Sequence, residues 1–243
     1  MEVYIEADRL RKEFGSLVAV DDISFRVARG EVLGFLGPNG AGKSTTMKML
    51  TGFLPPTAGS ARICGIDIGR DPVNAKRRLG YLPEGAPLYP EMTPATFLDF
   101  IAGVRGLDKA RARQRLEELA ETIHLKEVWH RPIETLSKGF KRRVGLAQAI
   151  LHDPDVLILD EPTDGLDPNQ KHEVRQLVRS MAEHKAIIVS THILEEVDAI
   201  CSRAMIIDRG RIVADGTPQE LVQGYENLDA MFRALTTSKE VAA

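Results

Sequence analysis

Short apolar runs separated by turns fill the first quarter of the chain. The runs are VYIEA at 3–7, ISFRV at 23–27, EVLGFLG at 31–37 and ARICGIDI at 61–68. Runs of this length between turn residues predict β-strands. EVLGFLG is apolar on both faces, which indicates a buried central strand. Because GPNGAGKST and the helical run STTMKMLTG follow it at once, the predicted order is strand, glycine-rich turn, helix.

Helical spacing replaces this pattern from about Pro94 to Leu151, for example at Leu116, Leu119, Ala120 and Ile123. Strand-like runs then return as VLILD, AIIVS, RAMIID and GRIVADG, with a helix after Pro168 and another through LEEVDAI. Such alternation predicts an α/β fold with a mainly parallel sheet covered by helices. We expect one domain over 1–220, interrupted by a helical insert at about 85–151, then a short helix and polar tail over 221–243.

Composition narrows the class of protein. Hydrophobic residues make up 43% and charged residues 28%, as in a water-soluble α/β protein. The 32 Lys and Arg are balanced by 35 Asp and Glu, so no global positive field attracts nucleic acid, and no nucleic-acid partner is expected.

Cysteine usage and hydropathy bear on the compartment. Cys64 and Cys201 lie far apart without metal-ligand spacing, which favours a reducing cytosol over a disulfide framework or a zinc site. The sequence has neither a secretory start nor a run of eighteen apolar residues. We therefore expect a cytoplasmic protein that a partner must bring to any membrane at which it acts.

The stretch GPNGAGKS at 37–44 matches GxxxxGK[ST] in the strand, turn and helix context that this motif requires. Its glycines let backbone amides converge on phosphate oxygens, while Lys43 supplies a cation to the β- and γ-phosphates and the Ser44 hydroxyl a magnesium ligand. A plain connecting turn is the alternative, and the complete motif disfavours it. The predicted nucleotide-binding residues are Gly37, Pro38, Asn39, Gly40, Ala41, Gly42, Lys43, Ser44 and Thr45.

Two carboxylates end the apolar strand of VLILDEP, at the strand edge where α/β sheets place ligands. The backbone turns at a strand end, so Asp160 can face magnesium while Glu161 reaches an attacking water. We assign Asp160 to the metal and Glu161 to general base catalysis, with Lys43 as a catalytic cation. The alternative is a solvated turn before Pro162.

With LSKGFKRRVGLAQAI at 136–150, the sequence resembles the ATP-binding subunits of ABC transporters. It departs from the common LSGGQ form at Lys138 and Phe140 and keeps Ser137 and Gly139. The resemblance implies that these two contact the γ-phosphate of ATP held by the other subunit of a head-to-tail dimer. The alternative for KGFKRR is a solvated basic helix face or a nucleic-acid patch.

Further landmarks of the family appear in order. Asp167 in GLDPNQ resembles the loop that communicates across the dimer, and His192 in STH resembles the switch histidine that contacts the γ-phosphate. Phe14 resembles the aromatic that stacks on adenine. The alternative for His192 is an ordinary histidine at a strand end, and the alternative for Phe14 is a phenylalanine at the edge of the core. Glu84 stands where the family usually has glutamine, so the resemblance implies a metal ligand that also communicates with the membrane partner.

The resemblance implies a P-loop NTPase fold with a RecA-like parallel-sheet core, a small antiparallel β subdomain and a helical signature subdomain. It implies ATP and Mg²⁺ as cofactors, a homodimer or heterodimer of ATP-binding subunits, and a separate integral membrane permease subunit. The family docks that subunit near Tyr89, Pro90 and Met92, for which local packing is the alternative.

The motifs look most like exporter subunits of the drug, polysaccharide and gliding-motility type, which act at the inner face of the cell membrane. An ATP-dependent clamp on nucleic acid or a ribosome is the alternative function, although those relatives usually carry two cassettes or a long insertion. A small-molecule kinase would leave LSKGF, Asp167 and His192 unexplained.

Overall fold

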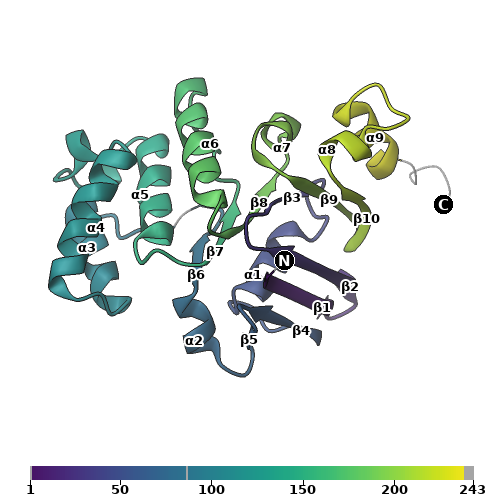
Figure 1. The fold of residues 1–243 in the computed structure, drawn as a ribbon, viewed down its shortest axis with the longest axis horizontal. Coiled ribbons are helices and arrows are strands. Elements are labelled where there is room, and N and C mark those ends of the chain that lie inside the picture. The colour runs from purple at the N-terminus through teal and green to yellow at the C-terminus, as the bar shows by residue number, and fades with distance from the viewer. Residues whose placement is uncertain (1, 86, 238–243) are drawn as a thin grey trace.

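A six-stranded sheet forms the centre of the molecule (Figure 1). The computed structural model describes residues 2–85 and 87–237. Five strands of this sheet are parallel, and β10 pairs antiparallel with β9 at one edge. The strands, in sheet order, are β10 (Arg211–Gly216), β9 (Arg203–Asp208), β3 (Val32–Leu36), β8 (Ala186–Thr191), β7 (Val156–Asp160) and β6 (Leu79–Leu82).

A second, four-stranded antiparallel sheet packs against the first. Its strands, in sheet order, are β2 (Leu17–Ala28), β1 (Val3–Phe14), β4 (Ala58–Ile63) and β5 (Ile66–Asp67). The two sheets share an apolar core in which the rings of Phe25 on β2 and Phe35 on β3 lie 5.8 Å apart. Met47, Met49 and Leu50 of the first helix fill the same core, so the glycine-rich turn before that helix has a fixed support.

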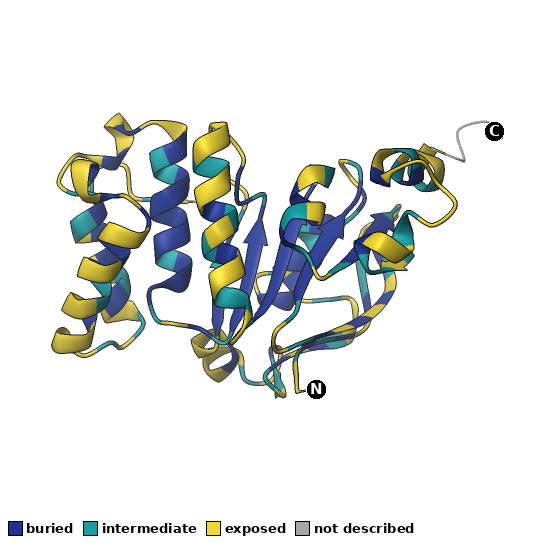
Figure 2. Ribbon diagram, turned by 45° about the horizontal axis from the view of Figure 1, so that its top comes forward, coloured by how far each residue is buried: buried dark blue, intermediate teal, exposed yellow. Residues whose placement is uncertain are grey.

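Helices cover the central sheet and build a separate helical part at one end (Figures 1 and 2). They are α1 (Lys43–Leu50), α2 (Pro72–Arg77), α3 (Pro94–Val104), α4 (Lys109–Thr122), α5 (Lys138–Ile150), α6 (Pro168–Ala182), α7 (Leu194–Ile200), α8 (Pro218–Leu221) and α9 (Leu228–Thr237). Two 3₁₀ turns, η1 (Lys126–Val128) and η2 (Ile133–Thr135), lie between α4 and α5. Leu119 and Ile123, two of the apolar positions with helical spacing, are buried in the core that joins α3 to α5 with the sheet.

The fold class expected from the sequence is confirmed, and every strand-like run forms a strand. The sequence pattern did not predict β6, because its four residues follow the short helix α2 directly and include Gly80. A Cβ at Gly80 would lie 2.1 Å from the Ala149 carbonyl oxygen, so the close approach of α5 to β6 requires glycine there. The short helices α2 and α8 were also not predicted.

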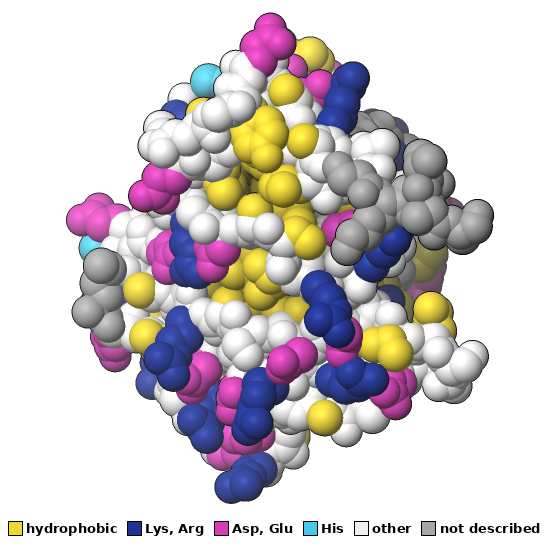
Figure 3. Space-filling view, turned by 90° about the vertical axis from the view of Figure 1, so that its right-hand side faces the viewer, with side chains coloured by type: hydrophobic (Ala, Val, Ile, Leu, Met, Phe, Trp, Pro, Cys, Tyr) yellow, Lys and Arg dark blue, Asp and Glu magenta, His cyan; other side chains and the backbone are white. Residues whose placement is uncertain are grey.

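Apolar side chains gather at the end of the molecule that carries α8 and α9, in the upper half of the face in Figure 3. They form a small core with α7, and Leu228 and Met231 of α9 are buried in it. The short C-terminal helix expected after residue 220 is therefore present, while the last six residues of the expected polar tail lie outside the described residues. No helix in the described part of the chain is long and apolar enough to span a membrane.

Candidate functional site

The glycine-rich turn lies between β3 and α1 at the carboxyl end of the central sheet. Gly40 and Gly42 have φ of 80° and 107°, values that favour glycine. Gly37 also needs to lack a side chain, because a Cβ there would lie 2.3 Å from the Ile207 carbonyl oxygen. No side chain of residues 2–85 or 87–237 caps the start of α1, so the N–H groups of its first turn are available to bind an anion.

Lys43 lies folded over the turn. Its Nζ donates hydrogen bonds to the carbonyl oxygens of Gly37 at 2.7 Å and Pro38 at 3.2 Å, and the residue is buried. Burial lowers the pKa of Lys43, while the charges of Glu161, Asp160 and Glu84 act in the opposite direction. A buried ammonium bound only to neutral carbonyls gains from an anionic partner, so the turn is prepared for phosphate.

Asp160 at the end of β7 is buried, and neither of its carboxylate oxygens has a hydrogen-bond partner in the described part of the chain. Burying an unpaired carboxylate is costly, and a cation would offset that cost. Asp160 therefore fits a magnesium ligand. Ser44 and Thr45, in the first turn of α1, are half-buried, and the Ser44 hydroxyl suits the same metal.

Glu161 and His192 form a pair at the ends of two neighbouring strands. The backbone N–H of Glu161 donates to the Ser190 carbonyl at 2.8 Å, which continues the pairing of β7 with β8. Glu161 then adopts a left-handed φ of 52°, so its side chain leaves the strand differently from Asp160. Its Oε1 lies 2.8 Å from Nδ1 of His192, which directly follows β8.

Arg142 is a candidate functional residue that the sequence analysis missed. Although KGFKRR was weighed against a solvated basic face, Arg142 is buried. Its guanidinium donates to the Pro83 carbonyl at 2.9 Å and to the backbone carbonyls of Asp160 and Glu161. One side chain of α5 thus holds both the strand end that carries the carboxylates and the segment that precedes Glu84.

Ser137 and Gly139 lie at the start of α5. The Ser137 hydroxyl caps this helix by accepting a hydrogen bond from the Phe140 N–H at 3.3 Å. Lys138 pairs with Asp164 at 2.9 Å, which lowers the pKa of that carboxyl. In the described part of the chain no hydrogen bond or ion pair joins Ser137 or Gly139 to the glycine-rich turn, so one chain by itself does not bring the two motifs together.

The remaining predicted site residues lie at exposed positions. Phe14 ends β1 and is 49% exposed, with Lys12 Nζ 5.3 Å from the ring centroid, so it is no part of the core. Asp167 caps α6 by accepting from the Gln170 N–H at 3.0 Å. Glu84 is exposed just after β6, and Asn39 is exposed at the tip of the glycine-rich turn.

Tyr89, Pro90 and Met92 lie before α3. The Tyr89 ring packs edge-on against Phe97 and Phe100 at about 6 Å and is still 47% exposed. The local packing is thus observed, and the docking of a membrane subunit at this exposed ring stays a prediction. Met92 packs against the core of the helical part.

Comparison with known proteins points in one direction. A family model described as ABC transporter matches residues 20–164. The Nod factor export ATP-binding protein I of Paraburkholderia xenovorans (strain LB400) is 41% identical over 231 residues, which are 95% of this chain and 76% of that protein. The probable multidrug ABC transporter ATP-binding protein YbhF of Escherichia coli (strain K12) is 40% identical over 221 residues, but these cover 90% of this chain and only 38% of that protein.

Solved structures agree with the sequence relatives. A structure described as the ATP binding subunit of an ABC transporter shares 31% identity with a TM-score of 0.89, covering 96% of this chain and 99% of that one. A dimeric ATP-binding cassette bound to ADP and Pi has a TM-score of 0.81 at 21% identity, which shows the fold alone.

Proposed function

Since the chain belongs to the ABC transporter family, we propose that it hydrolyses MgATP as one of two ATP-binding subunits that power export through a separate membrane subunit. The observation that carries the proposal is the Glu161–His192 pair beside a phosphate-binding turn and the unpaired carboxylate of Asp160. The names of the relatives, which include multidrug and Nod factor export proteins, support the export role. They favour it over an ATP-dependent clamp on nucleic acid or a ribosome.

Binding of ATP starts at the turn between β3 and α1. The N–H groups of the turn and of the first turn of α1 bind phosphate oxygens, and Lys43 exchanges its carbonyl partners for the β- and γ-phosphates. Phe14 offers an exposed ring for stacking on adenine. Magnesium, held by Ser44, Asp160 and Glu84, would neutralise part of the phosphate charge.

Hydrolysis then uses the pair at the strand ends. Glu161 accepts a proton from the water that attacks the γ-phosphorus, and the bond from that phosphorus to the oxygen of ADP breaks. Because Nδ1 of His192 contacts Glu161, Nε2 is the ring nitrogen left to contact the γ-phosphate. Arg142, bound to the backbone of Asp160 and Glu161, keeps both carboxylates at the sheet edge.

A groove between the central sheet and the helical part is the proposed docking place of the membrane subunit. It is a hollow of about 1100 Å³ whose lining comes from the loop after α1, from α2, from the segment after β6, and from α3 and α4. Glu84 is one of the lining residues, and its charge also acts on Lys43. A segment in this groove would therefore contact a residue that is electrostatically linked to the nucleotide site.

The test is to tag the Glu161→Gln variant and identify what copurifies from detergent-solubilised native membranes with MgATP. Because glutamine cannot accept the proton, we expect ATP binding to persist while hydrolysis falls by about a hundredfold or more. A polytopic membrane protein in stoichiometric amount is the expected companion. Recovery with ribosomes or nucleic acid from the soluble fraction would contradict the proposal. The matched control is Glu183→Gln, an exposed change directly after α6.

A further inference from the structure

Glu196 is a buried carboxylate that the proposed mechanism does not use. It lies in the first turn of α7 and is fully buried, whereas its neighbour Glu195 in the same turn is exposed. Its Oε2 has no hydrogen-bond partner within residues 2–85 and 87–237. Burial raises the pKa of Glu196, and the charge of Glu161 acts in the same direction. Burying a carboxyl group costs free energy, so the bonds that Glu196 makes indicate what it does there.

One oxygen of Glu196 is bound to the segment that carries Glu161. Its Oε1 accepts a hydrogen bond from the hydroxyl of Thr163, a buried residue two positions after Glu161. This segment is a tight turn, in which the Asp164 N–H donates to the Glu161 carbonyl at 3.1 Å. Because Thr163 and Glu161 belong to the same turn, a bond that fixes Thr163 also limits the movement of the Glu161 backbone.

The same carboxylate is bound to the segment that carries His192. Although burial raises the pKa of Glu196, a hydrogen bond with Thr191, the last residue of β8, acts to lower it. The Thr191 hydroxyl also accepts from the Ile193 N–H at 3.0 Å, so the residues on either side of His192 are joined to each other. Glu196 is therefore bonded to both of the segments that carry the Glu161–His192 pair.

We propose that Glu196 is a positioning residue for ATP hydrolysis, whose carboxylate fixes the segment of Glu161 against the segment of His192. The inference rests on the proposed function. The 2.8 Å contact between Glu161 Oε1 and His192 Nδ1 joins two strand ends, so its geometry depends on how those ends are held. The bond from the Glu161 N–H to the Ser190 carbonyl holds them on one side, and Glu196 holds them beyond the sheet. Small displacements of reacting groups lower a rate strongly, so this attachment matters for the chemical step.

Glu196→Leu tests this role in the full chain, since leucine is of similar size and accepts no hydrogen bond. We expect kcat for ATP hydrolysis to fall about tenfold or more while KM for ATP stays within about twofold, because the bonds of Glu196 go to the strand ends rather than to the phosphate-binding turn. Glu196→Gln keeps an oxygen for the Thr163 hydroxyl and should hold kcat within about threefold of the wild type. Glu195→Leu, at the exposed position in the same turn, is the matched control and should leave both constants unchanged.

Combined variants show whether Glu196 acts through the pair. In a chain that already carries His192→Ala, adding Glu196→Leu should lower kcat by less than about twofold, since the contact that Glu196 supports is already lost. Thr163→Val removes only a hydroxyl and should lower kcat as Glu196→Leu does, with little further loss when the two are combined. Melting temperatures check that each variant folds, and Thr163→Val carries the test if Glu196→Leu does not fold.

The outcomes separate the inference from the proposed function. If Glu161→Gln loses hydrolysis while Glu196→Leu and Thr163→Val keep the wild-type kcat, the proposed function stands and the inference is wrong. The inference is also wrong if Glu196→Gln loses as much activity as Glu196→Leu, or if Glu196→Leu costs as much in the His192→Ala chain as in the wild type. If Glu161→Gln hydrolyses ATP as fast as the wild type, the proposed function itself fails.

Discussion

Glu84 connects two sites at the scale of a single residue. It lines the groove proposed for the membrane subunit, and its charge acts on Lys43 in the phosphate-binding turn. The side chain is exposed, so it can reorient when either site is filled. The family's usual glutamine would lack this charge, and the consequence should appear in the response to magnesium.

We expect Glu84→Gln to raise the magnesium concentration that gives half-maximal ATP hydrolysis about threefold, because a carboxylate attracts a divalent cation more strongly than an amide does. The measurement is the initial rate of phosphate release at fixed ATP over a series of magnesium concentrations. Glu91→Gln removes the same charge from an exposed position outside the groove lining and should leave the curve unchanged. Identical curves for the wild type and Glu84→Gln would dismiss a metal role for Glu84.

The sequence predicts the position of a residue in the fold well where local geometry decides that position. Gly42 and Asp160 each stand at the junction of a strand with the next element, and their environments follow from that junction. Arg142 could not be predicted in this way, because its burial depends on how α5 packs against β6 and β7. A pattern of charge along one helix does not reveal which arginine turns inward.

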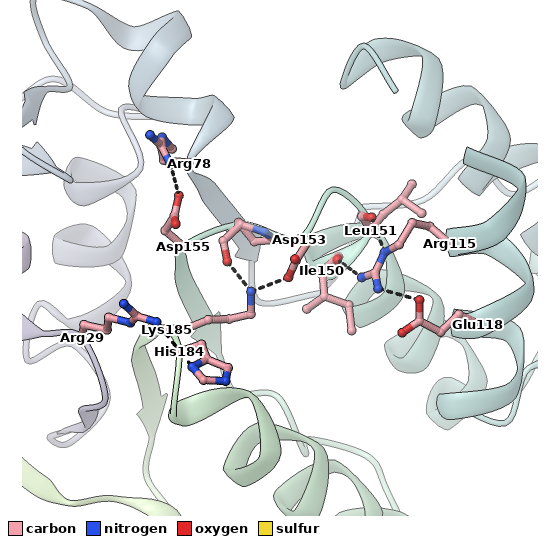
Figure 4. A network of polar contacts seen from close by, with 11 residues as sticks. Arg29, Arg78, Arg115, Glu118, Ile150, Leu151, Asp153, Asp155, His184 and Lys185 are labelled. Atoms are coloured by element: carbon pink, nitrogen blue, oxygen red, sulfur yellow. Dashed lines mark hydrogen bonds and ion pairs between the residues drawn. The ribbon is translucent and has the colours of Figure 1, made fainter. Parts of the chain in front are cut away.

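At the scale of elements, the helical part depends on how α4 holds the end of α5. Arg115 on α4 donates from Nε to the Leu151 carbonyl at 3.1 Å and from Nη2 to the Ile150 carbonyl at 3.0 Å, and it pairs with Glu118 (Figure 4). These carbonyls lie at the end of α5, where helix carbonyls lack intrahelical donors, and that of Ile150 also accepts from the Asp153 N–H at 3.1 Å. Nearby, Lys185, which directly precedes β8, pairs with Asp153, so the same segment is also attached to the sheet.

We expect Arg115→Lys to lower the free energy of unfolding by about 1–2 kcal/mol, because an ammonium cannot reproduce the two carbonyl bonds and the ion pair of the guanidinium. Arg113→Lys on the same helix is the control: among the residues that the structure describes, exposed Arg113 pairs only with Glu117, so its loss should stay below about 0.5 kcal/mol. Urea unfolding followed by the fluorescence of Trp129, the single tryptophan, reports on the helical part. Equal losses in the two variants would refute a capping role for Arg115.

The positions of the strands along the chain were more predictable than the neighbours that each strand has in the sheet. Apolar runs between turn residues located every strand except β6, which is too short to show a pattern and depends on β7 for its place at the edge of the sheet. The antiparallel pairing of β9 with β10 follows from the tight turn at Arg209 and Gly210, whose φ values are 47° and 78°. The order of the strands across the sheet is a property of tertiary packing, and no local pattern in the sequence contains it.

At the scale of the whole molecule, the glycine-rich turn and the start of α5, which we propose as the two halves of a nucleotide site, are not joined within the described part of one chain. The turn with Lys43 lies at the carboxyl end of the central sheet, whereas Ser137 caps α5 in the helical part. Two copies arranged head to tail would place the Ser137 of one chain against the nucleotide of the other. In such a dimer, unlike in a monomeric ATPase, a chain with a defective turn and a chain with a defective α5 start can still form one intact site together.

Two inactive variants should therefore restore activity when they are mixed. Lys43→Ala removes the phosphate cation, and Ser137→Asp keeps the helix cap but brings a negative charge toward the γ-phosphate of the partner's ATP. In an equal mixture about half of the dimers combine the two variants, and each contains one intact site of two. We expect ATP hydrolysis to rise to about a quarter of the wild-type rate.

The control mixes Lys43→Ala with Glu161→Gln, two changes that we place in the same half of the site. A mixed dimer of these variants retains no chain whose turn and base are both intact, so its activity should stay at the level of the separate variants. If the first mixture behaves like this control, Ser137 does not act on the nucleotide of a second copy. If both mixtures recover activity, the recovery does not come from the turn of one chain acting with the start of α5 of the other. The head-to-tail arrangement is then wrong for this chain.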